Sequence, residues 1–197
     1  MASVYTTSIA DCWLDLTFVV DSSGSVFGTD WKKSLEFVAD VVRKFTIGPD
    51  DVQVAFVLFS TKATVEWDLT GYPNKVDLER EILGMRYLGR GTNLNDALYL
   101  TRTEVYTRRR GARDGALRAA IILTDGDVGT WQTIENARLC KEDGIWLMAV
   151  AVKRGVDKDR LREIITLPSD FYSVYDFQAV PTIVADLKSK ICPEISK

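Results

Sequence analysis

Oxygen-bearing side chains crowd the stretch that follows the first apolar run of the sequence. In FVVDSSGSVFGTDW (18–31), Asp21, Ser23 and Ser25 stand within five positions, around Gly24. Asp, Ser and Gly are common turn residues, so the stretch could simply end a strand. Alternatively, the strand delivers hard oxygen ligands to one point in space.

Two more clusters of the same kind occur farther along the chain. GRGTNLNDAL (89–98) places Thr92 just ahead of a helical pattern, and IILTDGD (121–127) places Asp125 just after an apolar run. The carboxyl ends of parallel strands share one edge of a sheet, and ligands of open α/β sheets bind there, where the winding reverses. If the strand order is the common doubly wound one, Asp21 and Asp125 face each other at this edge, with Thr92 close by.

Two carboxylates and three hydroxyls form a hard set of oxygen donors. Such donors select Mg²⁺, Mn²⁺ or Ca²⁺ over softer metals. Few ligands with short hydroxyls leave room for water, which favours Mg²⁺ because this ion keeps part of its hydration shell. The sequence contains no histidine, which excludes Ser-His-Asp hydrolysis, Cys-His proteolysis and most catalytic zinc sites.

The ligands need strands that end at one edge, and the apolar pattern predicts such strands. Apolar runs alternate with helical patterns, which is typical of an α/β fold. We expect a doubly wound, Rossmann-like, mostly parallel six-stranded sheet with helices on both faces. The predicted strands are 14–20, 52–59, 63–69, 118–124, 145–152 and 171–177. The predicted helices are 30–45, with Asp30 as N-cap, and 76–86, 94–108, 131–143, 157–167 and 180–190.

The strand at 63–69 is expected to be an antiparallel edge strand. Only three residues, STK (60–62), separate it from the strand at 52–59, so the connection must be a hairpin. The 197 residues are expected to form one domain. A net charge of -3 argues against a nucleic-acid-binding protein. The longest apolar run, 145–152, is too short to cross a bilayer, and no secretory signal is visible.

The three cysteines divide into a terminal pair and an internal residue. Cys12 and Cys192 bracket nearly the whole domain, so a disulfide between them would tie its ends together and indicate an extracellular setting. The alternative is two unpaired thiols. Cys140 follows Ile134 and Ala137 at helical spacing, which predicts a small buried residue instead of a reactive thiol.

Together, the motifs resemble a von Willebrand factor type A domain. The resemblance is carried by DLTFVVDSSGS, VAFVLFS, GRGTNLNDAL, IILTDGD and CKEDGIWLMAVAV. It implies a single domain at 12–192, with flanking segments at 1–11 and 193–197. The cysteines at its ends also resemble those that tie the ends of some extracellular members of the family.

The resemblance implies a metal-ion-dependent adhesion site, or MIDAS. In it, hydroxyls of Ser23, Ser25 and Thr92 would bind the ion, and Asp21 and Asp125 would bind it directly or through water. The implied function is that of a secreted or ectodomain adhesion module, in which a Glu or Asp of a matrix protein such as collagen fills an open position on the metal. Four loop residues are candidates for contacting this partner: Gly28, Asp127, Val128 and Trp131.

Two other functions compete with metal-dependent adhesion. One is a load-bearing matrix protein that links fibres or mineral, with binding largely independent of the metal. The other is a Mg²⁺-dependent phosphotransferase with Asp21 as nucleophile. The enzyme is disfavoured because Ser23 stands where a second carboxylate is expected and the sequence has no GxxxxGK[ST] motif.

Binding is also expected to be nearly constitutive. In integrin inserted domains, the last helix shifts as the metal site tightens. A bridge between Cys12 and Cys192 would tether the helix at 180–190 and discourage a large displacement.

A run of arginines interrupts this acidic chain at TRRRGARDGALR (107–118). One interpretation is a solvated loop between a helix and a strand. The other is a docking patch for sulfated glycans or other anions. The candidate residues are Arg108, Arg109, Arg110 and Arg113, with Arg118 nearby.

Overall fold

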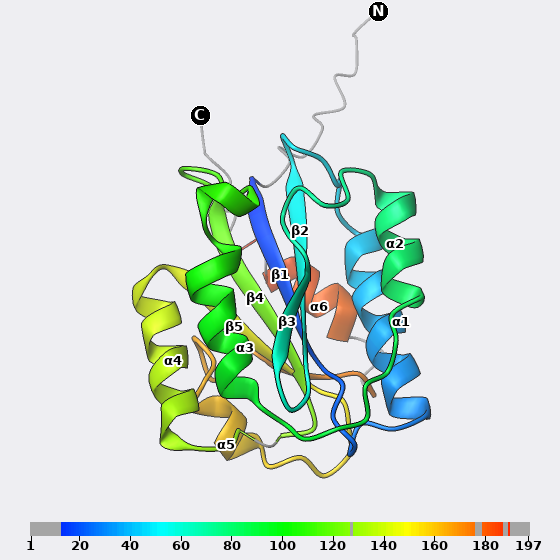
Figure 1. The fold of residues 1–197 in the computed structure, drawn as a ribbon, viewed down its shortest axis with the longest axis vertical. Coiled ribbons are helices and arrows are strands. Elements are labelled where there is room, and N and C mark those ends of the chain that lie inside the picture. The colour runs from blue at the N-terminus through cyan, green and yellow to red at the C-terminus, as the bar shows by residue number, and fades with distance from the viewer. Residues whose placement is uncertain (1–12, 127, 176–178, 187–188, 190–197) are drawn as a thin grey trace, which may run out of the picture.

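A six-stranded sheet forms the centre of the computed structural model, which describes residues 13–126, 128–175, 179–186 and 189. The strand order is β3-β2-β1-β4-β5-β6, and every neighbouring pair is parallel except β2 and β3. The doubly wound sheet with one antiparallel edge strand is therefore confirmed (Figure 1). The strands are β1 (Leu14–Asp21), β2 (Val52–Phe59), β3 (Ala63–Trp67), β4 (Leu117–Thr124), β5 (Ile145–Ala151) and β6 (Phe171–Ser173).

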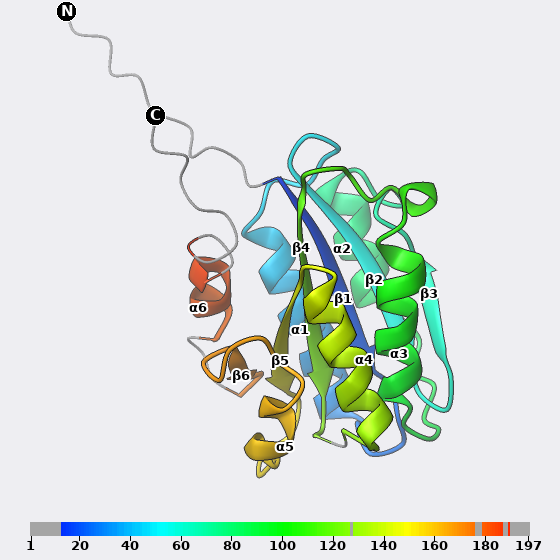
Figure 2. The ribbon, with the colours of Figure 1, turned by 90° about the vertical axis from the view of Figure 1, so that its left-hand side faces the viewer.

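Helices cover both faces of this sheet, as Figure 2 shows edge-on. On one face lie α1 (Thr29–Arg43), α2 (Lys75–Leu83) and α6 (Ala179–Asp186). On the other face lie α3 (Leu94–Leu100), α4 (Trp131–Glu142) and α5 (Lys158–Arg162). Cys140 is fully buried on α4, as its spacing predicts, and burial raises the pKa of its thiol to about 12.

The two helical layers require strands that are apolar on both sides, and β1 shows how the sequence meets this need. Its alternate residues Leu14, Leu16, Phe18 and Val20 pack against the α1 side, and Val19 packs against the α3 side. All eight residues of β1 are buried. Because β1 lies between β2 and β4, its end and the end of β4 meet where the winding of the sheet reverses.

Several predicted elements end earlier in the structure than the sequence pattern indicates. The helix predicted at 94–108 is α only to Leu100 and continues as a π-helical turn, η1 (Thr101–Val105). There the hydroxyls of Thr101 and Thr103 donate to the carbonyls four residues earlier, at 2.7 and 2.8 Å, and compete with regular helix geometry. A short 3-10 turn, η2 (Arg108–Arg110), follows.

The helix predicted at 157–167 is likewise shortened to α5. The Thr166 N–H donates to the Leu147 carbonyl, and the Leu147 N–H donates to the Thr166 hydroxyl, at 2.9 and 2.8 Å. These bonds to β5 draw the segment out of the helix. Asp30 is not an N-cap as predicted, since α1 is capped by Gly28 and Asp30 lies in its first turn.

Some sequence-based predictions fall outside the described residues. These are the flanking segments 1–11 and 193–197, the cysteines Cys12 and Cys192, the loop residue Asp127 and the end of the last predicted helix. Among the helices that the structure describes, none is long and apolar enough to cross a membrane.

Candidate metal centre

Asp21 is the last residue of the central strand β1, whose carboxyl end lies at the bottom of the sheet in Figure 1. Its side chain is fully buried and held by two hydrogen bonds. The Ser23 N–H donates to one carboxylate oxygen at 2.8 Å, and the Thr124 hydroxyl donates to the other at 3.0 Å. Since Thr124 ends β4, this second bond joins the two strands where the winding reverses.

The surroundings of Asp21 disfavour its negative charge. Burial raises the pKa of this carboxyl from 3.8 to about 6, and the nearby charge of Asp125 contributes to the rise. Hydrogen bonds from Ser23 and Thr124 act in the opposite direction without cancelling it. A buried carboxylate beside a second one is stabilised by a cation, so the charge of this pair fits a divalent metal ion.

Hydroxyl oxygens complete this side of the site. The Ser23 and Ser25 side-chain oxygens lie 3.0 Å apart, with Ser23 buried and Ser25 at the surface. Among the described residues, no group of three or more His, Cys, Asp or Glu side chains could hold a metal. A metal here would therefore depend on hydroxyls in addition to the two carboxylates, as the motif implies.

The loop that carries Thr92 is joined to the loop after β1. Arg90 forms a parallel β-bridge with Ser23, and the Gly24 N–H donates to the Arg90 carbonyl at 2.6 Å. The Tyr87 hydroxyl also donates to the Ser23 carbonyl at 2.8 Å. Thr92, which is half-buried, follows this bridge by two residues.

Ser22 adds two more bonds between these loops. Its carbonyl accepts from the Gly89 N–H at 3.0 Å, and its hydroxyl accepts from the Leu88 N–H at 2.8 Å. The sequence analysis did not predict this pairing of two loops that lie more than sixty positions apart in the chain, nor the role of Tyr87 in it. Neither Ser22 nor Tyr87 belongs to a periodic pattern that would have indicated the contact.

Asp125 lies just after β4 and has a basic neighbour. Its side chain is 9% exposed, and one of its oxygens lies 3.2 Å from the Nζ of Lys153, which is 33% exposed. Lys153 belongs to the loop that follows β5. The sequence motifs gave no signal for this residue.

The rim of the site differs in part from the sequence-based prediction. Trp131, the first residue of α4, is 70% exposed, and Gly28 is exposed with a φ of 61°, in the region that favours glycine. Phe27, which the sequence reasoning missed, is 73% exposed beside Gly28. Val128 is 1% exposed and packs in the core under α4, so it is not a surface contact.

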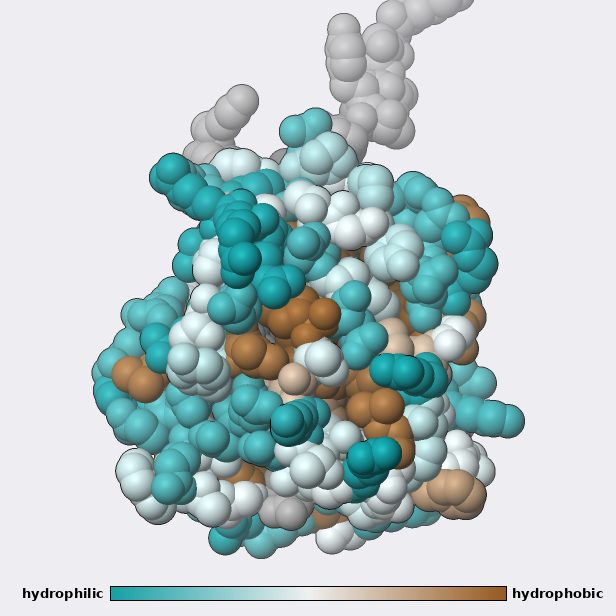
Figure 3. Space-filling model, in the orientation of Figure 1, coloured by the Kyte–Doolittle hydropathy of each residue, from teal (hydrophilic) through white to brown (hydrophobic). Residues whose placement is uncertain are grey.

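The predicted arginine patch is largely an ion-pair network. Arg108 pairs with Asp114, and Arg109 and Arg110 both pair with Glu104. Strongly hydrophilic side chains gather over this segment between α3 and β4 (Figure 3).

Arg113 does not belong to a surface patch, because its side chain is 12% exposed. It bonds the buried Asp15 at 2.8 Å. The interpretation that includes Arg113 in an anion-docking surface is therefore wrong for this residue.

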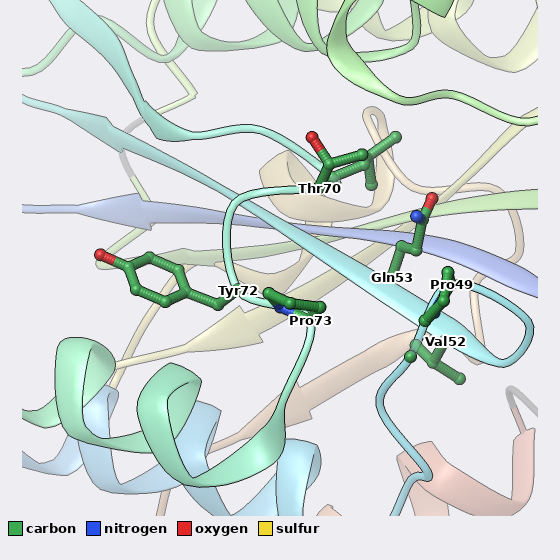
Figure 4. A pocket seen from close by; sticks show the side chains of 8 residues that line it. Pro49, Val52, Gln53, Thr70, Tyr72 and Pro73 are labelled. Atoms are coloured by element: carbon green, nitrogen blue, oxygen red, sulfur yellow. The ribbon is translucent and has the colours of Figure 1, made fainter.

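A small pocket of about 90 Å³ lies elsewhere in the fold (Figure 4). It opens beside the first residues of β2, at the edge of the sheet opposite to Asp21. Its lining residues, Gly48, Pro49, Val52, Gln53, Leu69, Thr70, Tyr72 and Pro73, include none of the predicted metal ligands.

The fold agrees with the comparison to known families. The sequence matches the model of the von Willebrand factor type A domain over residues 15–186. The chain belongs to this family.

Relatives of this von Willebrand factor type A domain include matrix proteins. Matrilin-4 of Mus musculus is 31% identical over 190 residues, which cover 92% of this chain and 30% of matrilin-4. The collagen alpha-1(XII) chain of Notophthalmus viridescens is 31% identical over 183 residues, which cover 92% of this chain and 20% of the collagen chain.

A solved structure, that of proximal thread matrix protein 1 from the mussel byssus, matches with a TM-score of 0.78 and 26% identity over 93% of this chain and 47% of its own. A further structure of the mussel protein has a zinc-occupied MIDAS motif. The chain thus spans less than half of the length of each of these relatives.

Proposed function

We propose that this domain is an extracellular adhesion module that binds a protein of the matrix through a divalent cation. The observation that carries the proposal is the burial of Asp21. The pKa of this fully buried carboxyl is raised to about 6, and the nearby charge of Asp125 contributes to the rise. A metal ion would stabilise the negative charge of these two carboxylates, which lie at the ends of the adjacent strands β1 and β4. Matrix proteins among the relatives support the extracellular setting and the class of partner.

The five ligands we assign are Asp21, Ser23, Ser25, Thr92 and Asp125. Two carboxylates offset the charge of a divalent ion, and hydroxyls add donors without adding charge. We assign Mg²⁺ as the ion, with Mn²⁺ and Ca²⁺ as the other hard cations that this set suits. When bound, the cation supplies a Lewis-acidic position that a Glu or Asp of the partner can fill.

The chain's own residues would orient the ligands and select the partner. The Ser23 N–H and the Thr124 hydroxyl fix the carboxylate of Asp21 before any ion arrives. Two exposed aromatic residues, Phe27 and Trp131, flank the segments that carry Ser25 and Asp125. A partner that presents an acidic residue between apolar ones would match this surface, and collagen or another matrix protein is the class we favour.

The experiment is a binding screen against immobilised collagens and other matrix proteins. Binding is measured in Mg²⁺, in EDTA, and after Mg²⁺ is restored, with Thr92→Ala as the site variant. Thr70→Ala is the matched control, because it removes the same hydroxyl from an exposed residue beside the first residues of β2, at the opposite ends of the strands from Asp21. We expect binding to vanish in EDTA and in Thr92→Ala, and to persist in the control.

A load-bearing matrix protein is the second candidate function. It is favoured by the collagen relatives and by the likeness to a thread matrix protein. Fibre or mineral binding that persists in EDTA would support it. Titration calorimetry that detects no uptake of Mg²⁺ or Mn²⁺ would overturn metal-dependent adhesion altogether.

A further inference from the structure

A lysine lies at the metal site in addition to the five oxygen ligands. The Nζ of Lys153 is 3.2 Å from a carboxylate oxygen of Asp125. Asp125 is nearly buried and Lys153 is one-third exposed, so their attraction is stronger than that of a fully exposed pair. Asp125 therefore already has a positive counter-charge within the chain.

The backbone fixes Lys153 in this place. The Val152 N–H donates to the Thr124 carbonyl at 3.0 Å, which joins the residue before Lys153 to the residue before Asp125. The two loops also pack closely, because a Cβ on Gly126 would meet the Val156 side chain at 2.5 Å. A lysine at 153 is consequently held beside Asp125 by the fold itself.

Two other cationic side chains of the structure, Lys33 and Arg154, face an aromatic ring instead of a carboxylate. The Nζ of Lys33 lies 3.9 Å from the centroid of the Tyr175 ring, and the Arg154 guanidinium lies 5.0 Å from the same ring. Asp21 is held by a backbone N–H and a neutral hydroxyl. The two carboxylates of the site thus differ in their partners: Asp125 pairs with the charged Lys153, and Asp21 accepts hydrogen bonds from neutral groups.

We propose that Lys153 is an internal competitor of the metal, which lowers the affinity of the site for divalent cations by occupying Asp125. This inference rests on the proposed function, since it concerns the same site. A divalent ion competes with the ammonium group for the Asp125 carboxylate and is repelled by its positive charge. Lys153 therefore sets the cation concentration at which the domain becomes able to bind its partner.

The test is titration calorimetry of Mg²⁺ and of Mn²⁺ on the metal-stripped full chain. We expect Lys153→Met to bind each ion about five- to thirtyfold more tightly than the wild type, as the loss of a half-shielded ion pair permits. Lys153→Gln, which keeps a polar side chain, should show the same gain. Lys153→Arg keeps the charge and should retain the wild-type affinity.

Arg154→Met is the matched control, because it removes the same charge from the next position while leaving the contact with Asp125. Its affinity should stay within about twofold of the wild type, as expected for an exposed charge screened by salt. Equal or weaker metal binding by both Lys153→Met and Lys153→Gln would overturn the inference, as would an equal gain in Arg154→Met. Absence of metal uptake by the wild type would instead overturn the proposed function.

Discussion

The single residue on which the site depends most is Asp21. Its charge lies in a buried position, and the structure supplies hydrogen bonds from neutral groups to it. Such a charge destabilises the metal-free protein, and under the proposed function a bound metal ion would remove this penalty.

Asp21→Asn should stabilise the metal-free domain and abolish its response to metal. An amide fits the same place, since the Thr124 hydroxyl can accept from it instead of donating. The pKa rise from 3.8 to about 6 corresponds to a gain on the order of 2–3 kcal/mol at pH 7. Urea unfolding in EDTA and in Mg²⁺ measures both effects.

The pH dependence of this gain has a definite sign. The folded state holds the Asp21 proton more tightly than the unfolded state, so the penalty is present above pH 6 and fades as the pH falls towards 4. The stability difference between variant and wild type should shrink over the same range. Asp50→Asn, an exposed residue, is the control; an Asp21→Asn protein less stable than wild type in EDTA at pH 7 would contradict the argument.

At the scale of elements, the decisive feature is the joining of two loops. Segments 22–24 and 87–91 are held together by a β-bridge and by hydrogen bonds from Tyr87 and Leu88. The Tyr87 ring also contacts Phe27 and Trp31, with centroids 6.1 and 5.8 Å away. These contacts position the turn that leads to Thr92.

Tyr87→Phe should weaken metal binding without unfolding the domain. It removes the hydroxyl that bonds the Ser23 carbonyl and keeps the ring contacts. We expect a loss of about 0.5–1.5 kcal/mol in stability and a severalfold weaker affinity for Mn²⁺, measured by urea unfolding and calorimetry. Tyr99→Phe, on the exposed face of α3, should change neither quantity; unchanged Mn²⁺ affinity in Tyr87→Phe would show that the loop does not depend on this bond.

At the scale of the whole molecule, stability and binding are placed at opposite edges of the sheet. The proposed metal site lies at the carboxyl ends of β1 and β4. At the other edge, Arg113 joins Asp15 and the carbonyls of Leu14, Pro49 and Asp51, at 2.7 to 3.0 Å. This largely buried arginine therefore connects three segments far from the candidate ligands.

Arg113→Ala should lower the free energy of unfolding by about 3–5 kcal/mol, because it leaves the carboxylate of Asp15 buried and unpaired. Arg108→Ala, in the same segment but exposed, should change it by less than about 0.5 kcal/mol. Metal affinity should stay at the wild-type value in both variants, measured below the melting temperature of the weaker one. A parallel loss of metal affinity in Arg113→Ala would show that the two edges are coupled.

The bridge between Cys12 and Cys192 and the nearly constitutive binding that follows from it stay predictions, because both cysteines lie outside the described residues. Intact mass before and after reduction would establish the bridge. If the bridge is formed, its reduction should change the dependence of partner binding on metal. Identical binding by the oxidised and the reduced protein would contradict the proposed effect of the bridge on the last helix.

The strands and their order could be predicted because their signals are local. Apolar runs of strand length and the three-residue hairpin connection at 60–62 identify the sheet and its antiparallel edge strand. Helix ends were less predictable, since threonine hydroxyls in η1 and bonds from Thr166 to β5 changed the geometry where the periodic pattern continued. Local periodicity cannot report such competition for backbone groups.

For the site, the sequence by itself determined which residues carry oxygen ligands and that they follow strand ends. Only the tertiary structure decided their surroundings: the burial of Asp21, the pairing of Ser23 with Arg90, the lysine on Asp125 and the burial of Val128. It also separated Arg113 from the other arginines. The physical reason is that burial and charge pairing depend on segments brought together across the sheet, and one-dimensional spacing does not encode those distances.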